Sequence, residues 1–361
     1  MMTFRQLGLS IYPDHSDFSK DKDYLALGKK YGYSRLFMSM LEADDILATK
    51  QKFSRIIAAA KELGYLTIID ISPRIFEKLR ISYQDLRFFA ELGVDGIRLD
   101  QGFDGNTEAL ISYNPYGLII ELNMSNDVAY LENILSYQAN KPYLFGCHNF
   151  YPQVGTGLTE EFFLECSERF KKNGIHTAAF VASQHGEQGP WNVNDGLPTL
   201  ESDRYLPIQV QAKKLFATGF IDDVIIGNAY ATEEELKALA EMDRYQLQLK
   251  VDFLAEATEL ERKIACDMQH FRRGDTNALV ARSTQSRVIY KEEENPPHTN
   301  NIEFKFGDVL IGNDQFGIYK NELQIVLTPH KDTRKNKIGR ISKDELVLLK
   351  YLNPWTKFRF I

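Results

Sequence analysis

Short apolar runs alternate with amphipathic segments over the first two thirds of the chain. Eight runs have the length of β-strands, and they cover residues 7–13, 36–40, 66–72, 96–100, 117–124, 143–150, 177–183 and 224–228. Most are separated by stretches such as KFSRIIAAAKELGY, in which apolar residues recur every three or four positions. Several of these stretches end in Leu-Gly or Asn-Gly, where glycine supplies the left-handed residue that closes a helix. Eight strands joined by helical crossovers predict an α/β fold, a closed parallel (β/α)8 TIM barrel.

An open, doubly wound sheet is the main alternative to this barrel. A dinucleotide-binding sheet of that kind carries Gly-x-Gly-x-x-Gly directly after its first strand. The first run here ends in Tyr-Pro-Asp-His instead. The sequence therefore favours the barrel.

The pattern changes after about residue 244. Short alternating runs follow one another closely, among them ALVARST, SRVIYK, GDVLIGN, GIYKNELQIVL and LVLLKYL. Runs of this kind without long intervening helices are typical of a small all-β domain. A chain of 361 residues accommodates a barrel and a smaller unit. We therefore predict a catalytic barrel over residues 1–244 and a β-rich domain over residues 245–361.

Charge and hydropathy exclude several classes of protein. The chain has 43 basic and 50 acidic residues, a net charge of -7, and no long block of lysine or arginine, so nucleic acid is not an expected partner. No segment approaches the roughly 18 consecutive apolar residues of a membrane span, and the start lacks a signal-peptide pattern. We expect a soluble cytoplasmic protein without a membrane partner, and a homodimer is left open.

The cysteine and histidine spacings do not indicate a metal or a disulfide framework. Three cysteines, Cys147, Cys166 and Cys266, show no Cys-x-x-Cys spacing. Neither His-x-His on the first strand nor His-Glu-x-x-His is present. We predict no bound metal and no cofactor.

Three carboxylates stand out on the predicted strands. Asp70, Asp100 and Glu121 each end an apolar run, in LTIID, GIRLD and GLIIE. A carboxylate in such a run is costly unless it is paired or functional, and the carboxyl ends of barrel strands converge on one mouth. Glycoside hydrolysis needs two carboxyl groups with different pKa values. We predict Asp100 and Glu121 as the catalytic pair, with Asp70 as the substitute member. The alternative is that Arg98 holds Asp100 in a structural ion pair.

Other polar side chains follow the predicted strands and are candidates for contact with a substrate. A single histidine such as His148 is more often a structural group than a catalyst. Two candidates belong to the second domain and would take part if that domain covers the mouth. The predicted substrate-binding residues are Tyr12, Arg74, Arg98, Asn123, His148, Asn149, His185, Asp308 and Tyr319.

Several segments also resemble a known family. They are LGLSIYP, RLFMSMLE, IIDISP, GIRLDQGF, IELNMSN, CHNFYPQVGTGL, VASQHGEQGP, GLPTLE and GDVLIGNDQFGIYKNELQIVL. Together they resemble the 6-phospho-N-acetylmuramidase family of two-domain bacterial proteins over nearly the whole chain. The resemblance implies a (β/α)8 barrel followed by a β-rich, cyclophilin-like C-terminal domain. It implies hydrolysis of the β-1,4 bond between N-acetylmuramic acid 6-phosphate and N-acetylglucosamine, a small phosphorylated disaccharide from peptidoglycan turnover in the cell wall.

Such a substrate would need cations in the site, because it carries about three negative charges. Arginine suits phosphate well, since its planar fork bonds two oxygens. The candidate groups are the side chains of Arg74, Arg98, His148 and His185, the backbone amides of Gly186, Gly189, Gly227 and Asn228, and, in the second domain, Arg282, Arg287 and Lys320.

Two other functions stay open at the level of sequence. One is a phosphosugar lyase or isomerase that uses a Schiff-base lysine or a metal, although none of the eight strand runs contains a lysine. The other is a phosphosugar-binding protein without catalytic activity, but this function does not explain why three strands end in a carboxylate. We expect a glycosidase.

Overall fold

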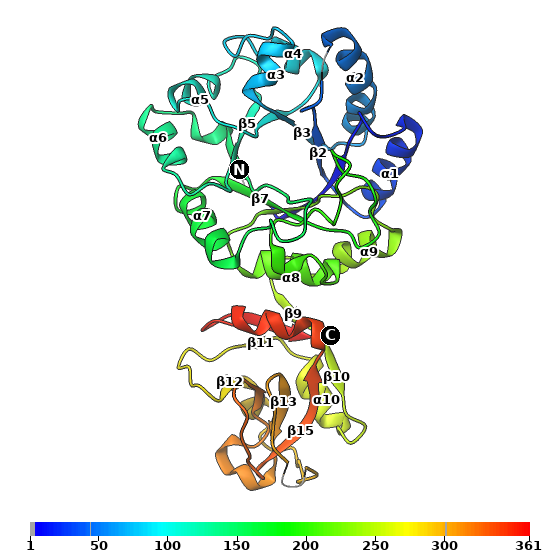
Figure 1. The fold of residues 1–361 in the computed structure, drawn as a ribbon. Coiled ribbons are helices and arrows are strands. Elements are labelled where there is room, and N and C mark those ends of the chain that lie inside the picture. Colours follow the sequence, from blue (N-terminus) through cyan, green and yellow to red (C-terminus); the bar gives the residue numbers. More distant parts are fainter. Residues whose placement is uncertain (1–3, 44, 300–301) are drawn as a thin grey trace. The chain divides into compact units, whose positions relative to one another are not determined.

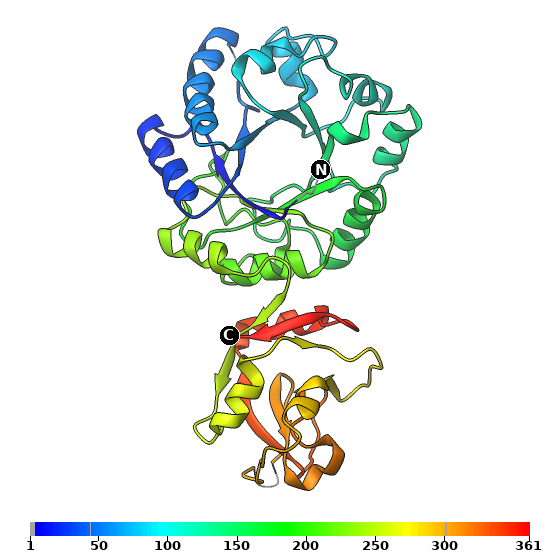
Figure 2. The same cartoon turned by 180° about the vertical axis from the view of Figure 1, so that it is seen from behind.

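Eight parallel strands close into a barrel in which β8 pairs with β1 (Figures 1 and 2). The computed structural model describes residues 4–43, 45–299 and 302–361. Each strand overlaps one of the predicted apolar runs, so the predicted (β/α)8 barrel is confirmed. The strands are β1 (Gln6–Ile11), β2 (Arg35–Ser39), β3 (Leu66–Ile71), β4 (Gly96–Leu99), β5 (Ile119–Asn123), β6 (Leu144–Cys147), β7 (His176–Val181) and β8 (Asp223–Ile226).

Helices surround the barrel, as Figures 1 and 2 show from its two ends. They cover the outer face of the strands, so the strands are buried on both sides and read as continuous apolar runs. The α-helices are α1 (Phe18–Lys30), α2 (Ile46–Glu62), α3 (Pro73–Lys78), α4 (Arg87–Leu92), α5 (Asn106–Ile111), α6 (Tyr130–Ser136), α7 (Glu160–Lys172), α8 (Ile208–Ala217) and α9 (Glu233–Glu241). Two short 3-10 turns are η1 (Lys141–Tyr143) and η2 (Glu201–Asp203).

The helix ends follow from local sequence. Thr159 caps α7 by accepting a hydrogen bond from the backbone of Phe162, and acidic residues occupy the first turn while basic residues occupy the last. Gly93 ends α4 with φ 88°, a left-handed conformation that glycine adopts without strain. These signals set where each helix stops and the next strand begins.

The chain folds into two compact units, Met1–Glu241 and Met242–Ile361, and the second unit contains two small sheets. The five-stranded sheet has the order β10-β15-β13-β14-β12 and is antiparallel, and the three-stranded sheet has the order β11-β16-β9. The elements of the second unit are β9 (Leu247–Leu249), β10 (Val251–Phe253), α10 (Glu259–Cys266), β11 (His270–Phe271), β12 (Val280–Ser283), α11 (Gln285–Ile289), β13 (Asp308–Gly312), η3 (Asp314–Tyr319), β14 (Leu323–Val326), β15 (Lys335–Ile341), η4 (Lys343–Tyr351) and β16 (Lys357–Phe360).

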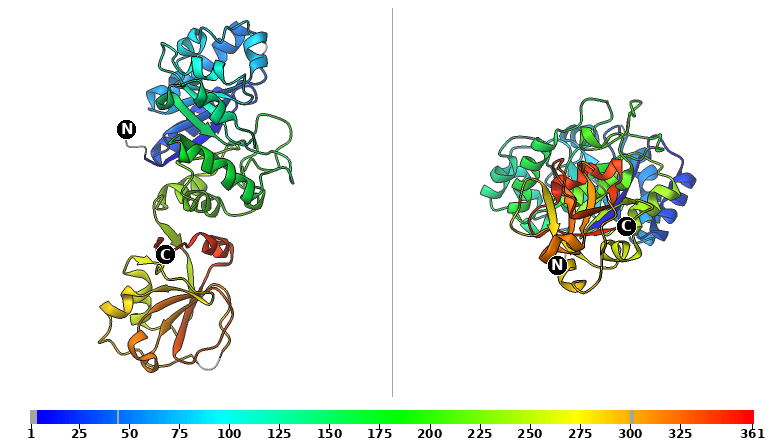
Figure 3. Two further views of the ribbon diagram at one scale, coloured as in Figure 1. Left: turned by 90° about the vertical axis from the view of Figure 1, so that its left-hand side faces the viewer. Right: turned by 90° about the horizontal axis from the view of Figure 1, so that it is seen from below.

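Each unit has its own apolar core. In the second unit Phe304, Leu310 and Val326 pack together without exposure above 1%. Figure 3 shows the barrel from its side, with the long loop segments coloured green extending from one end. In the part of the chain that the structure describes, no helix combines the length and the apolar content that crossing a bilayer requires.

Candidate active site at the barrel mouth

An arginine joins two of the three predicted carboxylates at the carboxyl ends of β3 and β4. Asp70 is the fifth of the six residues of β3, and Asp100 directly follows β4. Arg98 Nη1 donates to Asp70 Oδ1 at 2.6 Å and lies 3.5 Å from Asp100 Oδ1. Because both oxygens contact one nitrogen, they lie within about 6 Å of each other, near the separation of the two carboxyl groups in retaining glycosidases.

The two carboxyl groups differ in their surroundings. The side chain of Asp70 is 4% exposed, whereas that of Asp100 is 31% exposed. Burial raises the pKa of Asp70 to about 7; Arg98 opposes this increase, and the negative charges of Asp100 and Glu121 add to it. One carboxyl group of the pair is therefore partly protonated near neutral pH, while the other is in contact with water. Such a division of environments is typical of acid/base pairs in enzymes.

A chain of hydrogen bonds from β6 orients Arg98. Its Nη2 donates to Asn149 Oδ1, and the backbone N–H of Asn149 donates to Ser125 Oγ at 2.8 Å. Ser125 Oγ in turn lies 3.1 Å from His148 Nδ1, while His148 Nε2 lies 2.9 Å from Ser167 Oγ. Four hydrogen bonds therefore connect Ser167 of α7 to the guanidinium that holds both carboxyl groups.

His148 supports the site from behind. It has no exposed surface, and burial together with the charge of Arg98 lowers its pKa to about 3. The enclosed imidazole acts on Asn149 through Ser125. Contact of His148 with a substrate stays a prediction.

Asn123 and Tyr12 also hold the backbone of the mouth. Asn123 Nδ2 donates to the carbonyl oxygen of Asp100 at 2.9 Å, and its Oδ1 accepts from the backbone of Ser125 at 2.8 Å. The Tyr12 hydroxyl donates to the carbonyl oxygen of Gly227, which ties β1 to β8. Both side chains are at least 95% buried, so they support the backbone around the mouth and expose little surface of their own.

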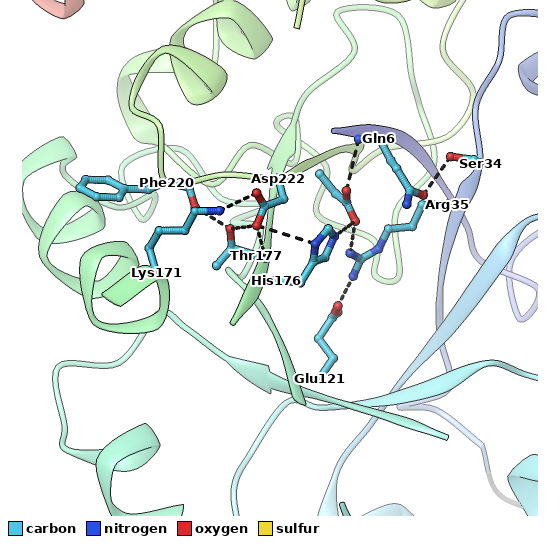
Figure 4. A network of polar contacts seen from close by, with 10 residues as sticks. Gln6, Ser34, Arg35, Glu121, Lys171, His176, Thr177, Phe220 and Asp222 are labelled. Carbon is cyan, nitrogen blue, oxygen red and sulfur yellow. Dashed lines mark hydrogen bonds and ion pairs between the residues drawn. The ribbon is translucent and has the colours of Figure 1, made fainter. Parts of the chain in front are cut away.

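Glu121 belongs to a different cluster, which Figure 4 shows. It does not end its strand as the sequence indicated, because β5 continues through Leu122 and Asn123. Its Oε2 accepts a hydrogen bond from Arg35 Nη2, and Arg35 Nη1 donates to Asp223 Oδ2 at 2.5 Å. Arg35 and Asp223 are the first residues of β2 and β8, so this network extends toward the amino ends of the strands.

Charge pairing in that cluster keeps the carboxyl group of Asp223 ionised. Glu121 and Asp223 have no exposed surface, and Arg35 is 1% exposed. Burial alone would raise the pKa of Asp223, but Arg35 and His176 outweigh it and hold the pKa below its usual value. The arrangement is that of a buried ion network within the barrel. The catalytic assignment of Glu121 stays a prediction.

A cavity of about 500 Å³ lies among the loops that follow β1, β7 and β8. The loop after β1 contributes His15, the first turn of α1 contributes Lys20, and the loop after β7 contributes His185 and Trp191. The ring centroids of Trp191 and Phe150 are 6.2 Å apart, and Phe150 directly follows the Asn149 that binds Arg98. The cavity and the carboxyl pair are therefore joined along the end of β6.

A second, very small hollow lies beside the cavity. It shares His15 with the cavity and is also lined by Tyr12 and Ser39. Ser39 is the register partner of Asp70 between β2 and β3, so one residue of this hollow lies on the strand next to that of the buried carboxyl group.

For three further predicted binding residues, Arg74, Asp308 and Tyr319, substrate contact stays a prediction. Arg74 is exposed in α3, and it takes part in no hydrogen bond or ion pair within residues 4–43, 45–299 and 302–361. Asp308 and Tyr319 belong to the second unit. Asp308 is fully buried and accepts from the backbone of Lys305 at 2.8 Å. Tyr319 lies beside two guanidinium groups, with Arg287 4.9 Å from its ring centroid.

Three residues of the site were not among the sequence candidates. Ser125 joins His148 to Asn149, Lys20 lines the cavity, and so does Trp191. Lys20 could have been noticed in the sequence, because it lies three residues after the capping Asp17, in a first helical turn where acidic residues are usually favoured. Among the described residues, no three His, Cys, Asp or Glu side chains are grouped as metal ligands.

Two of the sequence segments noted above are paired in space. The backbone of Leu158, in CHNFYPQVGTGL, donates to Thr199 of GLPTLE at 2.9 Å, and Glu201 donates back to Leu158 at 3.1 Å. Buried Arg204 donates to the carbonyl oxygen of Tyr151 at 2.9 Å and to Glu201 Oε2 at 2.5 Å. The hydrogen bond from Arg204 lowers the pKa of Glu201 to about 2. The two segments together fix the loops that border the cavity.

Comparison with known proteins gives the following similarities. The family model of the 6-phospho-N-acetylmuramidase N-terminal domain matches residues 7–241, and that of the C-terminal domain matches residues 247–361. The crystal structure of an uncharacterized B. cereus protein is 52% identical, covers 99% of both chains and has a TM-score of 0.93. A conserved protein of unknown function from a locus in Enterococcus faecalis is 25% identical, with 99% of this chain and 96% of that chain covered and a TM-score of 0.71. A search of curated proteins gave no match.

Proposed function

The chain belongs to the 6-phospho-N-acetylmuramidase family, and from this premise we propose that it is a glycosidase of peptidoglycan recycling. Its substrate is the disaccharide of N-acetylmuramic acid 6-phosphate and N-acetylglucosamine, whose β-1,4 bond it hydrolyses. The observation that carries the chemistry is the pair of carboxyl groups on Arg98, one buried with a pKa near 7 and one in contact with water.

In the proposed mechanism Asp70 is the general acid. A carboxyl group with a pKa of about 7 keeps a proton at neutral pH, and it can give that proton to the glycosidic oxygen as the bond to the muramic acid ring breaks. N-acetylglucosamine leaves as the alcohol. Arg98 holds the Asp70 carboxylate that results, because its guanidinium is already in place.

Asp100 is the proposed nucleophile. Its carboxylate attacks the anomeric carbon, which forms a glycosyl ester, and a water molecule then hydrolyses the ester while Asp70 takes the proton from that water. The separation of about 6 Å at most supports this retaining route, because an inverting pair needs about 6.5–9.5 Å to leave room for water. Asn123 holds the backbone of Asp100, so the carboxylate keeps its place through both steps.

The first experiment is turnover of the phosphorylated disaccharide and of its unphosphorylated counterpart by the purified protein, with mass spectrometry of the released sugars. Cleavage of the phosphorylated form, with the β-anomer as first product by NMR, would support the proposal. Absence of cleavage of either disaccharide would contradict it and favour the phosphosugar lyase.

Two variants separate the roles of the carboxyl groups. Asp70→Asn should lose at least about 100-fold in kcat on the disaccharide, because proton donation to a poor leaving group is worth that much, and far less on an aryl glycoside whose leaving group needs no proton. Asp100→Asn should lose activity on both substrates. Asp127→Asn, a change at an exposed ion pair with Arg169, is the matched control.

A further inference from the structure

Three basic side chains line the cavity beyond the carboxyl pair, and the proposed chemistry uses none of them. They are His15, Lys20 and His185. The Lys20 ammonium lies 4.0 Å from the ring centroid of Tyr230, and within the described parts of the chain it forms no salt bridge with a carboxylate. His15 Nε2 lies 3.0 Å from Glu42. Lys20 is therefore an exposed cation at the edge of a polar hollow. Its charge acts on the buried carboxyl group of Asp21, where it opposes the rise in pKa that burial causes.

Lys20 also occupies an unfavourable place in its helix. It is the third residue of α1, where the positive end of the helix dipole disfavours a cation. Asp17 caps this end by accepting from the backbone of Ser19 at 2.9 Å and of Lys20 at 3.3 Å. An anion in the cavity would interact favourably with both the ammonium and the helix end.

The acidic groups nearby leave room for such an anion. Asp21 is buried, and its two oxygens accept hydrogen bonds from Ser16 at 2.6 Å and from the Tyr230 hydroxyl at 2.7 Å. Glu42 faces His15. Glu187 is the remaining acid of the cavity lining, and it is exposed, so its charge is screened by water.

The rest of the lining suits a sugar. Trp191 keeps 42% of its surface exposed, which leaves part of the indole free for the apolar face of a pyranose. Gln188, Asn192 and Asn194 supply amides for hydroxyl groups. A volume of about 500 Å³ lies within the usual range for small-molecule sites.

From these observations we infer that this cavity binds the phosphate of a phosphorylated sugar, with Lys20 as the residue that selects for it. His15 and His185 add imidazole donors, and Trp191 packs against the ring. That the sugar is the muramic acid unit rests on the proposed function, because its anomeric carbon must then reach Asp100. Preference for the phosphorylated disaccharide follows from Lys20.

The selectivity experiment compares Lys20→Gln with Lys22→Gln, the same change at an exposed position of the same helix. Lys20→Gln should lower kcat/KM for the phosphorylated disaccharide at least tenfold and leave the unphosphorylated one within twofold. Lys22→Gln should change neither value. Equal losses on both disaccharides, no loss, or a selective loss in Arg74→Gln instead of Lys20→Gln would overturn the inference.

A binding experiment needs no turnover. The chain has two tryptophans, Trp191 and Trp355, so Trp355→Phe leaves Trp191 as the fluorescent reporter of the cavity. Titration with N-acetylglucosamine 6-phosphate should change its emission, N-acetylglucosamine should bind at least tenfold more weakly, and Lys20→Gln should abolish the difference. No preference for the phosphorylated sugar would overturn the inference. Lys20-dependent binding without glycosidic cleavage would support it while contradicting the proposed function.

Discussion

Arg98 sets the chemistry of the mouth at the residue scale. One guanidinium contacts Asp70, Asp100 and Asn149, although it is buried and 2% exposed. A buried guanidinium is stable only if carboxylates and hydrogen bonds satisfy it, so Arg98 holds its three partners in fixed positions relative to one another. The pair of carboxyl groups is therefore preorganised by a residue that need not touch the substrate.

The pH dependence of turnover is the first prediction at this scale. In the proposed mechanism Asp70 acts in its protonated form, and since its pKa is about 7, kcat/KM should fall as pH rises above 7. The measurement is kcat/KM across neutral pH, and Asp70→Asn should lack this decline. A decline centred in the ordinary carboxyl range would argue against Asp70 as the acid.

The same pKa has a consequence for stability. A carboxyl group whose pKa is raised by folding loses stabilisation when it ionises, so the free energy of unfolding should fall as pH rises from the ordinary aspartate value toward 7. Asp70→Asn should flatten that part of the curve. Denaturant unfolding at several pH values gives the comparison, and an unchanged slope in the variant would contradict the assignment.

Glu121 provides the second residue-scale test, because the two interpretations of this residue predict different losses in the free energy of unfolding when it is replaced. If it belongs to the buried network with Arg35, Glu121→Gln should lower the free energy of unfolding by about 3 kcal/mol, since Arg35 keeps only Asp223 as a carboxylate partner in a site closed to water. Asp127→Asn, at an exposed ion pair, should cost less than about 1 kcal/mol. Unchanged stability with lost activity would instead support Glu121 as a catalytic group.

At the scale of elements, the segments after β6 and β7 behave as one structure. Their backbones form a bridge between Leu158 and Leu200, and Arg204 reaches across to Tyr151. The loop that carries Trp191 lies between β7 and this bridge in the chain. The position of the cavity wall thus depends on contacts made by residues that do not line it.

We expect Arg204→Ala to loosen both segments. It removes a buried guanidinium with five hydrogen-bonded neighbours, and it leaves the carboxylate of Glu201 without its partner, so a loss of about 3–5 kcal/mol in the free energy of unfolding should follow. Hydrogen exchange should increase in residues 151–158 and 195–201. Arg169→Ala, at a partly exposed ion pair, is the control. Unchanged exchange in Arg204→Ala would contradict this role.

At the scale of the whole molecule, the chain has two compact units with separate cores. All residues of the proposed chemistry and of the cavity lie in the first unit. The second unit has a buried polar cluster of its own, in which Glu261 contacts His298 at 2.8 Å and Asn336 at 2.9 Å. Each unit can therefore be perturbed without touching the other's interior.

Calorimetry of the full chain should show two unfolding transitions, because each unit has its own core. Arg204→Ala should lower the temperature of one transition and Glu261→Gln that of the other. A single transition that both variants shift by the same amount would mean that the two units unfold as one.

The barrel could be predicted from the sequence because its cause is local. Strand-length apolar runs occur eight times, most of them are separated by amphipathic stretches and several of these end in glycine, and few folds satisfy that repetition. The same local reasoning placed Asp70, Asp100 and Arg98 at one mouth, since parallel strands bring their carboxyl ends together. It also placed Asn149 there, as the second residue after β6.

Tertiary structure alone decided which carboxyl groups form the pair. Asp70 and Glu121 look alike in sequence, as single acids in apolar strands, but Arg98 holds the first at the mouth while Arg35 holds the second in the barrel interior. Partner choice of this kind depends on how neighbouring strands stagger and on which long side chain reaches which oxygen. The pKa of Asp70 depends on the same facts, because burial and neighbouring charge come from the packed barrel and not from the order of residues along one strand.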